Sequence, residues 1–424
     1  MTKLIPLAVA LSSVVFPAAP VAAQVAAAAS TPVSGLRFNA LGEITYDTNA
    51  LRISDSAPLA LGETSKDDIR YSPAINAQYV RAVGRTVLTV DGLAGRDFYQ
   101  NNKYLNRNRF AGGGSLSYRA ASCSAVVNGN YSSRQNGTRD FGNVVPAVGV
   151  PIPDDIGRLT DNRQIEVVYG LNVSCGGNGR LSFGGGAQRS ELRNAGVTRR
   201  FGDSDSNVYS LFAGIGVLRP GQLRINGSYS TINYPNLLTT PGLALPPFAL
   251  NNSVKTYSVG LSYTRPIGTK LTGTIGASYL TSRPDGPQAP YSSPAYNINL
   301  IYVPSNRLTL SIAGSRSAIA SQTAGALFRV VDSIDVSASY RLGEKIFTTA
   351  NAGLISNSYN QPFATVGQPA RQHDSSKIIG AGVSYRPRKL YDIGLSVNQT
   401  YRTSDISIYS YNSTQIIFNV AIHI

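Results

Sequence analysis

The chain has 424 residues, of which only 14% are charged, 41 are glycine and none is tryptophan; the formal net charge is +15 and the mean hydropathy is −0.07. No stretch beyond the N-terminus reaches the roughly 18 to 20 continuous apolar residues that a membrane helix needs, and helical periodicity is nearly absent after residue 35. These features exclude a helical membrane protein and indicate an all-β chain.

The first residues predict an export signal. Lys3 supplies a positive charge, Leu4–Phe16 an apolar core, and Val21-Ala22-Ala23 the small residues at which a signal peptidase cuts. The mature chain is therefore expected to begin at Gln24, with a low-complexity lead-in. The predicted organisation is a signal peptide at 1–23, a flexible lead-in at 24–34 and the folded part at 35–424.

Segments after residue 35 alternate between apolar and polar residues. In residues 223–229, Leu223, Ile225 and Tyr229 alternate with polar residues, and residues 271–279 and 391–398 follow the same pattern. A period of two places one set on each face of a β-strand. A polar inner face indicates a hydrated interior, and strands in lipid must close into a ring because unpaired backbone groups are not tolerated there.

The connections between these segments differ systematically in length. The short set comprises 81–85, 119–122, 176–179, 219–222, 265–270, 304–307, 342–345 and 386–389. The long set includes 54–67, 101–108, 134–162, 194–206, 234–253, 283–295, 318–331 and 361–376. Short turns at one rim and long loops at the other are typical of outer-membrane β-barrels, where they are periplasmic and extracellular respectively.

Tyrosines mark both ends of the segments. One set stands just before the short turns: Tyr79, Tyr118, Tyr263, Tyr302, Tyr340 and Tyr385. The other set stands at the opposite ends: Tyr46, Tyr131, Tyr229, Tyr279, Tyr359 and Tyr401. Two aromatic levels that bracket an apolar band predict the girdles of a transmembrane barrel. The alternative is ordinary strand-end tyrosine in a soluble sandwich.

The strand count follows from the connections. A leading strand at Gly35–Leu51, eight hairpins and a closing strand at Asn412–Ile424 make about 18 antiparallel strands, with 16 to 18 expected. The predicted fold class is thus an all-β transmembrane antiparallel barrel with short periplasmic turns and long extracellular loops. The final segment, Phe418–Ile424, resembles the C-terminal assembly signal of outer-membrane barrels, but it ends in Ile424 where an aromatic residue is usual.

Two cysteines in an exported chain suggest one disulfide. Cys123 follows one short turn and Cys175 precedes the next, so they fall at the same end of neighbouring antiparallel strands. Both share the outward parity of their strands. A disulfide between them is the expected arrangement, with two separate thiols as the alternative.

Fourteen basic residues lie in or beside the short turns, against Glu344 alone. Such residues would attract anionic headgroups of the inner leaflet. The basic residues are Arg81, Arg85, Arg119, Arg180, Arg219, Arg224, Arg265, Lys270, Arg307, Arg341, Lys345, Arg386, Arg388 and Lys389. The predicted inner wall carries both signs, which leaves a mild anion preference open. Its candidate pore-lining residues are Arg37, Glu43, Arg70, Arg109, Glu166, Arg224, Asp392 and Arg402.

Two long connections are unusually apolar for solvated loops. One contains Val144–Pro153 and the other Leu237–Leu250. Either could fold into the barrel and narrow it, or form a lid or a partner contact. The candidate constriction residues are Val144, Val148, Ile152, Asp154, Asp155 and Arg158.

Chemistry-bearing clusters are scarce, so no enzyme activity is predicted. The chain has two histidines, and only His373-Asp374 resembles an acid–base pair. The acidic pairs Asp67-Asp68 and Asp154-Asp155 are better explained as surface than as cation sites. No catalytic residue, cofactor site or metal site is therefore expected, and nucleic acid is not an expected partner.

Three short motifs carry a family resemblance. Tyr46–Asn49, then Lys66–Asp68 with Pro73, then Leu93–Tyr99 resemble the putative β-barrel porin 2 family. The resemblance implies a barrel in the outer membrane of a Gram-negative bacterium, often associated with exopolysaccharide gene clusters. It transfers no catalytic residues.

The expected function is accordingly a porin-like channel: the exit for an exopolysaccharide or a diffusion pore for small solutes. The alternative is a non-conducting structural or adhesion barrel that acts through its extracellular loops. The expected partners are outer-membrane lipid and lipopolysaccharide, the barrel-assembly machinery and polysaccharide-secretion components.

Overall fold

The structure is a computed structural model of the chain. It describes residues 34–55, 57–59, 63–135, 163–176, 181–196, 200, 202–217, 221–236, 252–268, 270–285, 289–320, 326–359, 372–388 and 390–424. The expected signal peptide and all of the lead-in except Ser34 lie outside these ranges.

The described residues form antiparallel strands joined by turns and loops. The strands are β1 (Gly35–Asp47), β2 (Asp68–Tyr71), β3 (Ala74–Val83), β4 (Thr86–Tyr99), β5 (Arg107–Ala120), β6 (Cys123–Gln135), β7 (Arg163–Gly176), β8 (Leu181–Asn194), β9 (Ser204–Gly216), β10 (Gln222–Asn233), β11 (Ser253–Ile267), β12 (Leu271–Pro284), β13 (Tyr291–Ser305), β14 (Leu308–Ala320), β15 (Phe328–Arg341), β16 (Ile346–Tyr359), β17 (His373–Arg388), β18 (Tyr391–Ser404) and β19 (Tyr411–His423). Two single turns of 3₁₀-helix, η1 (Lys103–Leu105) and η6 (Ser407–Tyr409), lie in connections. No helix in these ranges is long and apolar enough to cross a membrane.

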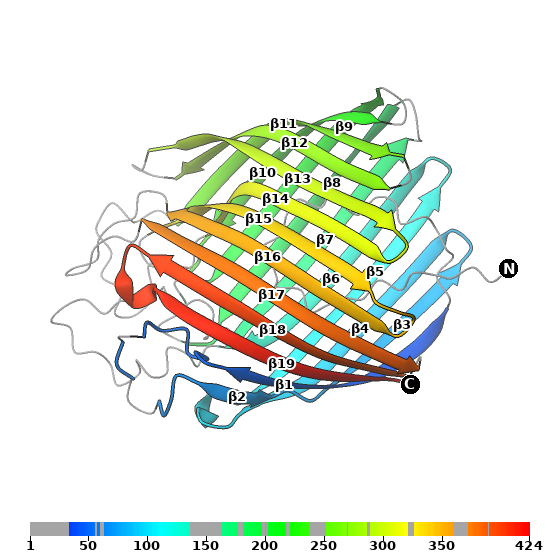
Figure 1. The fold of residues 1–424 in the computed structure, drawn as a ribbon. Helices are drawn as coiled ribbons and strands as arrows, with labels where there is room; N and C mark the ends of the chain where they lie inside the picture. The colour runs from blue at the N-terminus through cyan, green and yellow to red at the C-terminus, as the bar shows by residue number, and fades with distance from the viewer. Residues whose placement is uncertain are drawn as a thin grey trace. The chain divides into compact units, whose positions relative to one another are not determined.

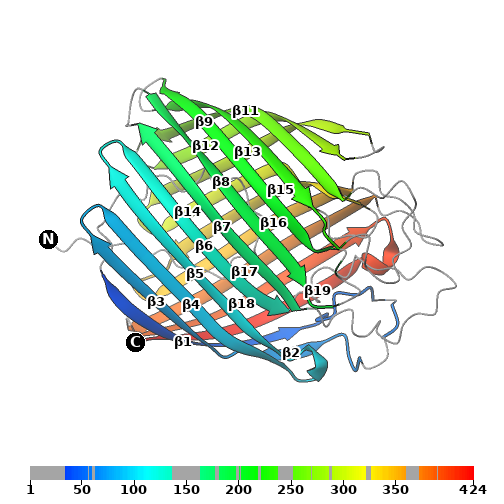
Figure 2. The same cartoon turned by 180° about the vertical axis from the view of Figure 1, so that it is seen from behind.

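The strands of residues 34–424 close into one barrel. Each strand pairs with its neighbours in chain order, and β1 pairs with β19, as Asn39 opposite His423 illustrates. Figure 1 shows β13–β19 crossing the near wall, and Figure 2 shows β3–β9 crossing the opposite wall. Closure leaves no strand edge unpaired in lipid.

The barrel wall has 18 strand positions, as predicted, but the bounds of the first hairpin differ from the prediction. The leading strand ends at Asp47 instead of Leu51, and the second strand position of the wall is interrupted. Its two parts, β2 and β3, both pair with β1 and β4. They therefore count as one strand, and the 19 strand segments form a closed 18-strand barrel. The interruption falls at Ser72-Pro73, because proline has no backbone N–H to donate to the ladder.

The two rims differ in connection length as expected. At one rim β3 and β4 are joined by two residues, Gly84 and Arg85, and β5 and β6 by Ala121 and Ser122. Gly84 has a φ of +57°, a left-handed conformation that suits glycine at so tight a turn. At the other rim β6 and β7 are 27 residues apart, at 136–162. The first rim is therefore periplasmic and the second extracellular.

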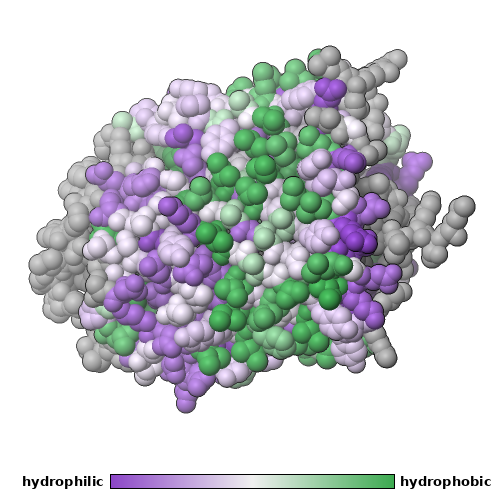
Figure 3. Space-filling model, in the orientation of Figure 1, coloured by the Kyte–Doolittle hydropathy of each residue, from purple (hydrophilic) through white to green (hydrophobic). Residues whose placement is uncertain are grey.

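The outer surface of the barrel is apolar in its middle. Large apolar residues project from it unburied, such as Leu211, 73% exposed, and Val259, 62% exposed. Figure 3 shows hydrophobic residues as a band across the middle of one face, with hydrophilic residues on either side. A soluble protein avoids so large an exposed apolar patch, whereas acyl chains would cover this band.

The tyrosine girdles lie largely where the sequence predicts them. The six tyrosines beside the short turns belong to the outward-facing set of their strands, and so do Tyr46, Tyr131, Tyr229, Tyr279 and Tyr401. Tyr359 is a correction: it belongs to the inward set of β16, is buried, and donates a hydrogen bond to Asp374 at 2.8 Å. Tyr209 and Tyr257 complete the outward row on either side of Tyr229: the ring of Tyr209 is stacked on that of Tyr229, and the ring of Tyr257 is tilted to it.

Candidate functional site

The eight charged residues that the sequence assigns to the inner wall all belong to the inward-facing set of their strands. On β1, for example, Leu36 and Ile44 are exposed outward, so Arg37 and Glu43 point inward. The same alternation places the other six inward: Arg70, Arg109, Glu166, Arg224, Asp392 and Arg402. Their contact with a permeating solute stays a prediction.

Most of these charges have a partner of opposite sign on the wall. Arg70 Nη2 lies 2.5 Å from Glu43 Oε1, and Arg109 Nε lies 3.2 Å from Asp97 Oδ1. Three further pairs are Arg386–Asp392 at 2.7 Å, Arg402–Asp374 at 3.0 Å and Arg52–Asp47 at 2.7 Å. Each pair nearly cancels its own field beyond a Debye length, so these paired charges add little net charge to the wall.

Arg37 and Arg224 are held differently. Arg224 stacks over the ring of Phe212, 4.9 Å from its centroid, and donates through Nε to Gln222 Oε1 at 2.9 Å. A cation over an aromatic face keeps its charge while part of its surface leaves water. Arg37 lies near the periplasmic end of β1 and forms no ion pair with a described residue.

The extracellular end of the wall contains a buried charged network. Asp374 is fully buried and accepts hydrogen bonds from Arg402 Nη2 and from Tyr359. The connection after β1 adds a second pair, since Arg52 donates to both carboxylate oxygens of Asp47. Buried charges need such partners because an unpaired charge in the protein interior strongly destabilises the fold. The chain after β1 thus folds over the inward side of the wall.

Between the charged groups, the wall carries hydroxyls that pair with one another across strands. Ser228 and Ser258 are 2.7 Å apart. Further pairs are Ser124–Ser174, Thr256–Ser282, Thr264–Thr274, Ser311–Ser337 and Ser315–Ser333. Cross-strand hydroxyl pairs stabilise a sheet and leave a polar uncharged surface.

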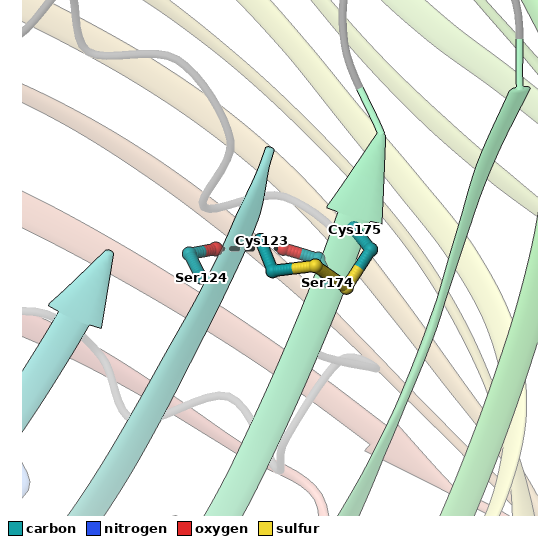
Figure 4. The surroundings of a disulfide bond; sticks show 4 residues. All are labelled: Cys123, Ser124, Ser174 and Cys175. Carbon is teal, nitrogen blue, oxygen red and sulfur yellow. Dashed lines mark hydrogen bonds between the residues drawn. A yellow bond between two sulfur atoms is a disulfide. The ribbon is translucent and has the colours of Figure 1, made fainter. Parts of the chain in front are cut away.

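Cys123 and Cys175 form a disulfide between β6 and β7. They stand directly opposite each other in the register, with Cα atoms 4.0 Å apart. Figure 4 shows the adjacent Ser124 and Ser174, whose hydroxyls are hydrogen-bonded at 2.8 Å. The serines belong to the inward set and the cysteines to the outward set with Val127 and Tyr169. The disulfide therefore lies on the outer surface, near the periplasmic rim.

The extracellular end of β14 separates from β13, whereas β15 stays paired with β16 as far as Arg329 opposite Tyr359. Pairing between β13 and β14 stops at Asn297 opposite Ser315, so residues 291–296 and 316–320 are not paired with each other. The β14–β15 ladder itself continues to Ala320 opposite Phe328. We call residues 316–320 and 326–331 the β14–β15 tip.

The β14–β15 tip packs against the inner side of the wall. Phe328 and Val330 belong to the outward set of β15, yet they are only 1% and 2% exposed. They form a buried cluster with Ile232 and Val254, which belong to the inward sets of β10 and β11. Strands β10 and β15 are five positions apart in the sheet, so this contact can form only if the tip folds over the inward face of β10 and β11.

Polar contacts hold the tip in the same place. Tyr234 donates through its hydroxyl to the carbonyl oxygen of Leu327 at 2.5 Å, and Arg316 Nη2 lies 3.2 Å from the hydroxyl of Tyr291. Inward residues of the neighbouring strands are buried as well: Thr256, Leu280, Ser282, Ser293 and Ala295. The tip thus covers part of the wall in its extracellular half and narrows the lumen there.

The sequence predicted that a different segment narrows the lumen. Residues Val144, Val148, Ile152, Asp154, Asp155 and Arg158 all lie outside the described residues, as does 237–251. The expectation that an apolar extracellular loop enters the barrel therefore stays a prediction. The tip that does enter comes from two strands of the wall.

The only candidate acid–base pair does not assemble. His373 is the first residue of β17, where the sequence placed a loop that extends to residue 376. It lies near Ser356 and Ser358 on the outward side, whereas Asp374 is buried on the inward side. His423 contacts Asn39 near the periplasmic rim at 2.7 Å. Within the described ranges, no group of three or more His, Cys, Asp or Glu side chains could hold a metal ion.

Comparison with known proteins gives a family. Residues 253–424 match the putative beta-barrel porin 2 family. The matched part begins at β11 and runs to the last residue, whereas the three motifs from which the resemblance was predicted lie at 46–99. Over these residues the match agrees with the predicted resemblance, and together with the apolar outer band it indicates a porin-like barrel of the Gram-negative outer membrane.

Several solved structures are similar to the fold. OccK2 (OpdF) of Pseudomonas aeruginosa aligns with a TM-score of 0.46 and 9% identity, covering 92% of this chain and 98% of that one. A BenF-like porin from Pseudomonas fluorescens Pf-5 gives 0.46 and 12%, covering 92% and 99%. The outer membrane protein opdK from Pseudomonas aeruginosa gives 0.44 and 10%, covering 92% and 99%. No curated protein matches the sequence.

Sequence reasoning missed the partners of the wall charges and the β14–β15 tip. Asp47, Asp97 and Asp374 had the correct parity for the wall, so alternation alone could have added them. The tip has a weaker signal: residues 326–331 are nearly all apolar, whereas an ordinary exposed strand would alternate.

Proposed function

We propose that the barrel is a passive channel for uncharged hydrophilic solutes, either a diffusion pore for small molecules or the exit for an exopolysaccharide. The pairing of wall charges, exemplified by Arg70–Glu43 and Arg109–Asp97, is the observation that carries this proposal. An acidic polymer would favour a wall with excess positive charge. A neutral or weakly acidic solute requires no such excess.

The test is conductance in planar lipid bilayers. The purified protein is expected to insert in discrete steps and to conduct. The paired charges predict that potassium and chloride pass with similar permeability, so the reversal potential across a salt gradient stays near zero. A strong preference for anions or cations would contradict the neutral wall, and the absence of steps would reject the channel.

A deletion strain separates the two kinds of channel. If the barrel is an exporter, loss of the gene stops a glycan from reaching the medium while uptake of small solutes is unchanged. If it is a diffusion pore, the deletion slows uptake of small sugars and leaves glycan secretion intact.

The folded tip favours a second candidate, a non-conducting barrel with a structural or adhesive role. The cluster of Phe328 and Val330 with Ile232 and Val254 covers part of the extracellular half of the lumen. Loss of cell attachment on deletion, combined with no conductance in bilayers, would favour this candidate over the channel.

The expected partners follow from position. The apolar band would contact lipid acyl chains, and basic residues at the short turns, such as Arg85 and Arg119, would contact anionic headgroups. Lipopolysaccharide would surround the extracellular half, and the final strand would engage the barrel-assembly machinery. Polysaccharide-secretion components would dock at the periplasmic rim if the barrel is an exporter.

A further inference from the structure

Asparagine and glycine recur as cross-strand partners on the inward face of the wall. Asn128 of β6 stands opposite Gly170 of β7, and Asn172 of β7 opposite Gly186 of β8. The other pairs are Asn130–Gly113, Asn226–Gly260, Asn297–Gly276, Asn351–Gly380, Asn398–Gly380 and Asn419–Gly394. We call these residues the asparagine–glycine belt.

The glycines make room for the amides. An added Cβ at Gly186 would overlap the side-chain oxygen of Asn172, and one at Gly276 would overlap that of Asn297. At Gly380 it would meet the oxygens of both Asn351 and Asn398. Glycine in a strand interior costs stability. Its use at Gly186, Gly276 and Gly380 is explained by this close approach, which places the amide oxygens against the neighbouring strand.

Most amides of the belt are free to bind a solute. Within the described residues, Asn128, Asn172, Asn297, Asn351 and Asn398 form no side-chain hydrogen bond, although each side chain is partly accessible. The same holds for Asn130 and Asn419. An amide offers two donors and one acceptor, and an inward polar group left without a protein partner is solvated by whatever fills the lumen.

The belt lies around the middle of the wall, with most of its asparagines on the periplasmic side. Its asparagines are between the fifth and the ninth residue from the periplasmic end of their strands. They come from β6, β7, β10, β13, β16, β18 and β19, which are spread around the barrel. Asp91 opposite Gly113 and Asp335 opposite Gly353 occupy equivalent positions on β4 and β15. The belt therefore faces the lumen from several sides, closer to the periplasmic rim than the β14–β15 tip.

We propose that this belt binds neutral polyhydroxylated solutes, that is, sugars, as they pass the middle of the channel. A sugar hydroxyl both donates and accepts hydrogen bonds, as an amide does, whereas a phosphate or carboxylate would be met best by unpaired cations. The inference rests on the proposed channel and adds its substrate class.

The experiment measures block of the ion current in planar bilayers by maltotetraose added on the periplasmic side. The wild-type channel is expected to show saturable block by maltotetraose and no saturable block by a polyethylene glycol of equal size, which has no internal hydroxyls. The variant replaces three belt residues with leucine, which is close to asparagine in volume: Asn172→Leu, Asn351→Leu and Asn398→Leu. Loss of about three hydrogen bonds should raise the half-blocking concentration at least about tenfold.

The control removes inward polar groups that already satisfy each other. Ser228→Ala with Ser258→Ala eliminates a hydroxyl pair at 2.7 Å and should leave the block unchanged. Heat-modifiable migration in gels identifies variants that have folded.

The failures of the two proposals are distinguishable. A wild-type channel that conducts but shows no saturable maltotetraose block overturns the sugar belt and leaves the channel standing. The same holds if the leucine variant is blocked as well as wild type. A protein that forms no conducting steps overturns the channel and the belt together.

Discussion

Replacing Phe328 with alanine should release the β14–β15 tip and widen the channel. Phe328 is 1% exposed and lies at the centre of the cluster with Ile232 and Val254. Large-to-small replacement of a buried phenylalanine costs about 3–5 kcal/mol. The tip is also held by β16, which pairs with residues 329–331. On its other side, β14 is not paired with β13 beyond Ser315, and the bond from Tyr234 to Leu327 contributes only about 1 kcal/mol.

That loss falls mainly on one local equilibrium, between a tip packed on the inward face of β10 and β11 and a tip that has left this face while β15 stays paired with β16. A cost of 3 kcal/mol changes the equilibrium constant by roughly a hundredfold. If the tip is packed for most of the time in the wild type, the variant should spend a large fraction of its time detached. Single-channel recordings should then show a higher conductance level that is rare or absent in the wild type.

The matched control is Val336→Ala on the same strand. Val336 faces outward and is 44% exposed, so its truncation removes contact with lipid and leaves the tip packed. Its conductance should equal that of the wild type. If Phe328→Ala folds, inserts and gives the wild-type conductance distribution, the argument that the tip narrows the lumen is wrong.

Three other changes test different parts of the barrel. Asp374→Ala leaves Arg402 buried without its carboxylate and should lower unfolding stability by about 3–5 kcal/mol, whereas replacing both with leucine should restore much of the loss; denaturant titrations in detergent measure both. Reduction of the disulfide, or Cys123→Ser with Cys175→Ser, should cost about 2–4 kcal/mol because the bond closes a loop between residues 52 positions apart; an unchanged midpoint would show that strand pairing already constrains the ends. Gly380→Val should displace two belt amides and weaken sugar block while the barrel still inserts, and normal block would show that those amides are not used.

The strand pattern could be predicted because the alternation of apolar and polar residues within each strand shows which residues lie on each of its two faces. In β10, Leu223, Ile225 and Tyr229 face lipid and Asn226 and Ser228 face the lumen, as the alternation alone implies. The same reasoning placed Cys123 and Cys175 on one side of neighbouring strands. The prediction was wrong at two points: the second strand is interrupted at Pro73, and the side chain of Tyr359 faces inward instead of outward.

The candidate site was predicted only in part. The parity of Arg70, Arg109 and Arg402 put them on the inner wall, but nothing in the sequence names the carboxylate that each one contacts. Such contacts depend on the register between strands and on which loop folds inward. The pairing of Asn128 with Gly170 is likewise invisible until the two strands are aligned.

The order of residues along each strand was enough to determine an outer-membrane barrel with a lipid-facing and a water-facing side, because a period of two in hydropathy is a local property of the chain. Tertiary structure alone decided which side chains contact one another on the wall of the lumen. The cluster of Phe328 with Ile232, the neutralised arginines and the ring of amides over glycines all join residues from different strands. Their contacts arise only when the sheet closes and brings those strands into register around a common interior.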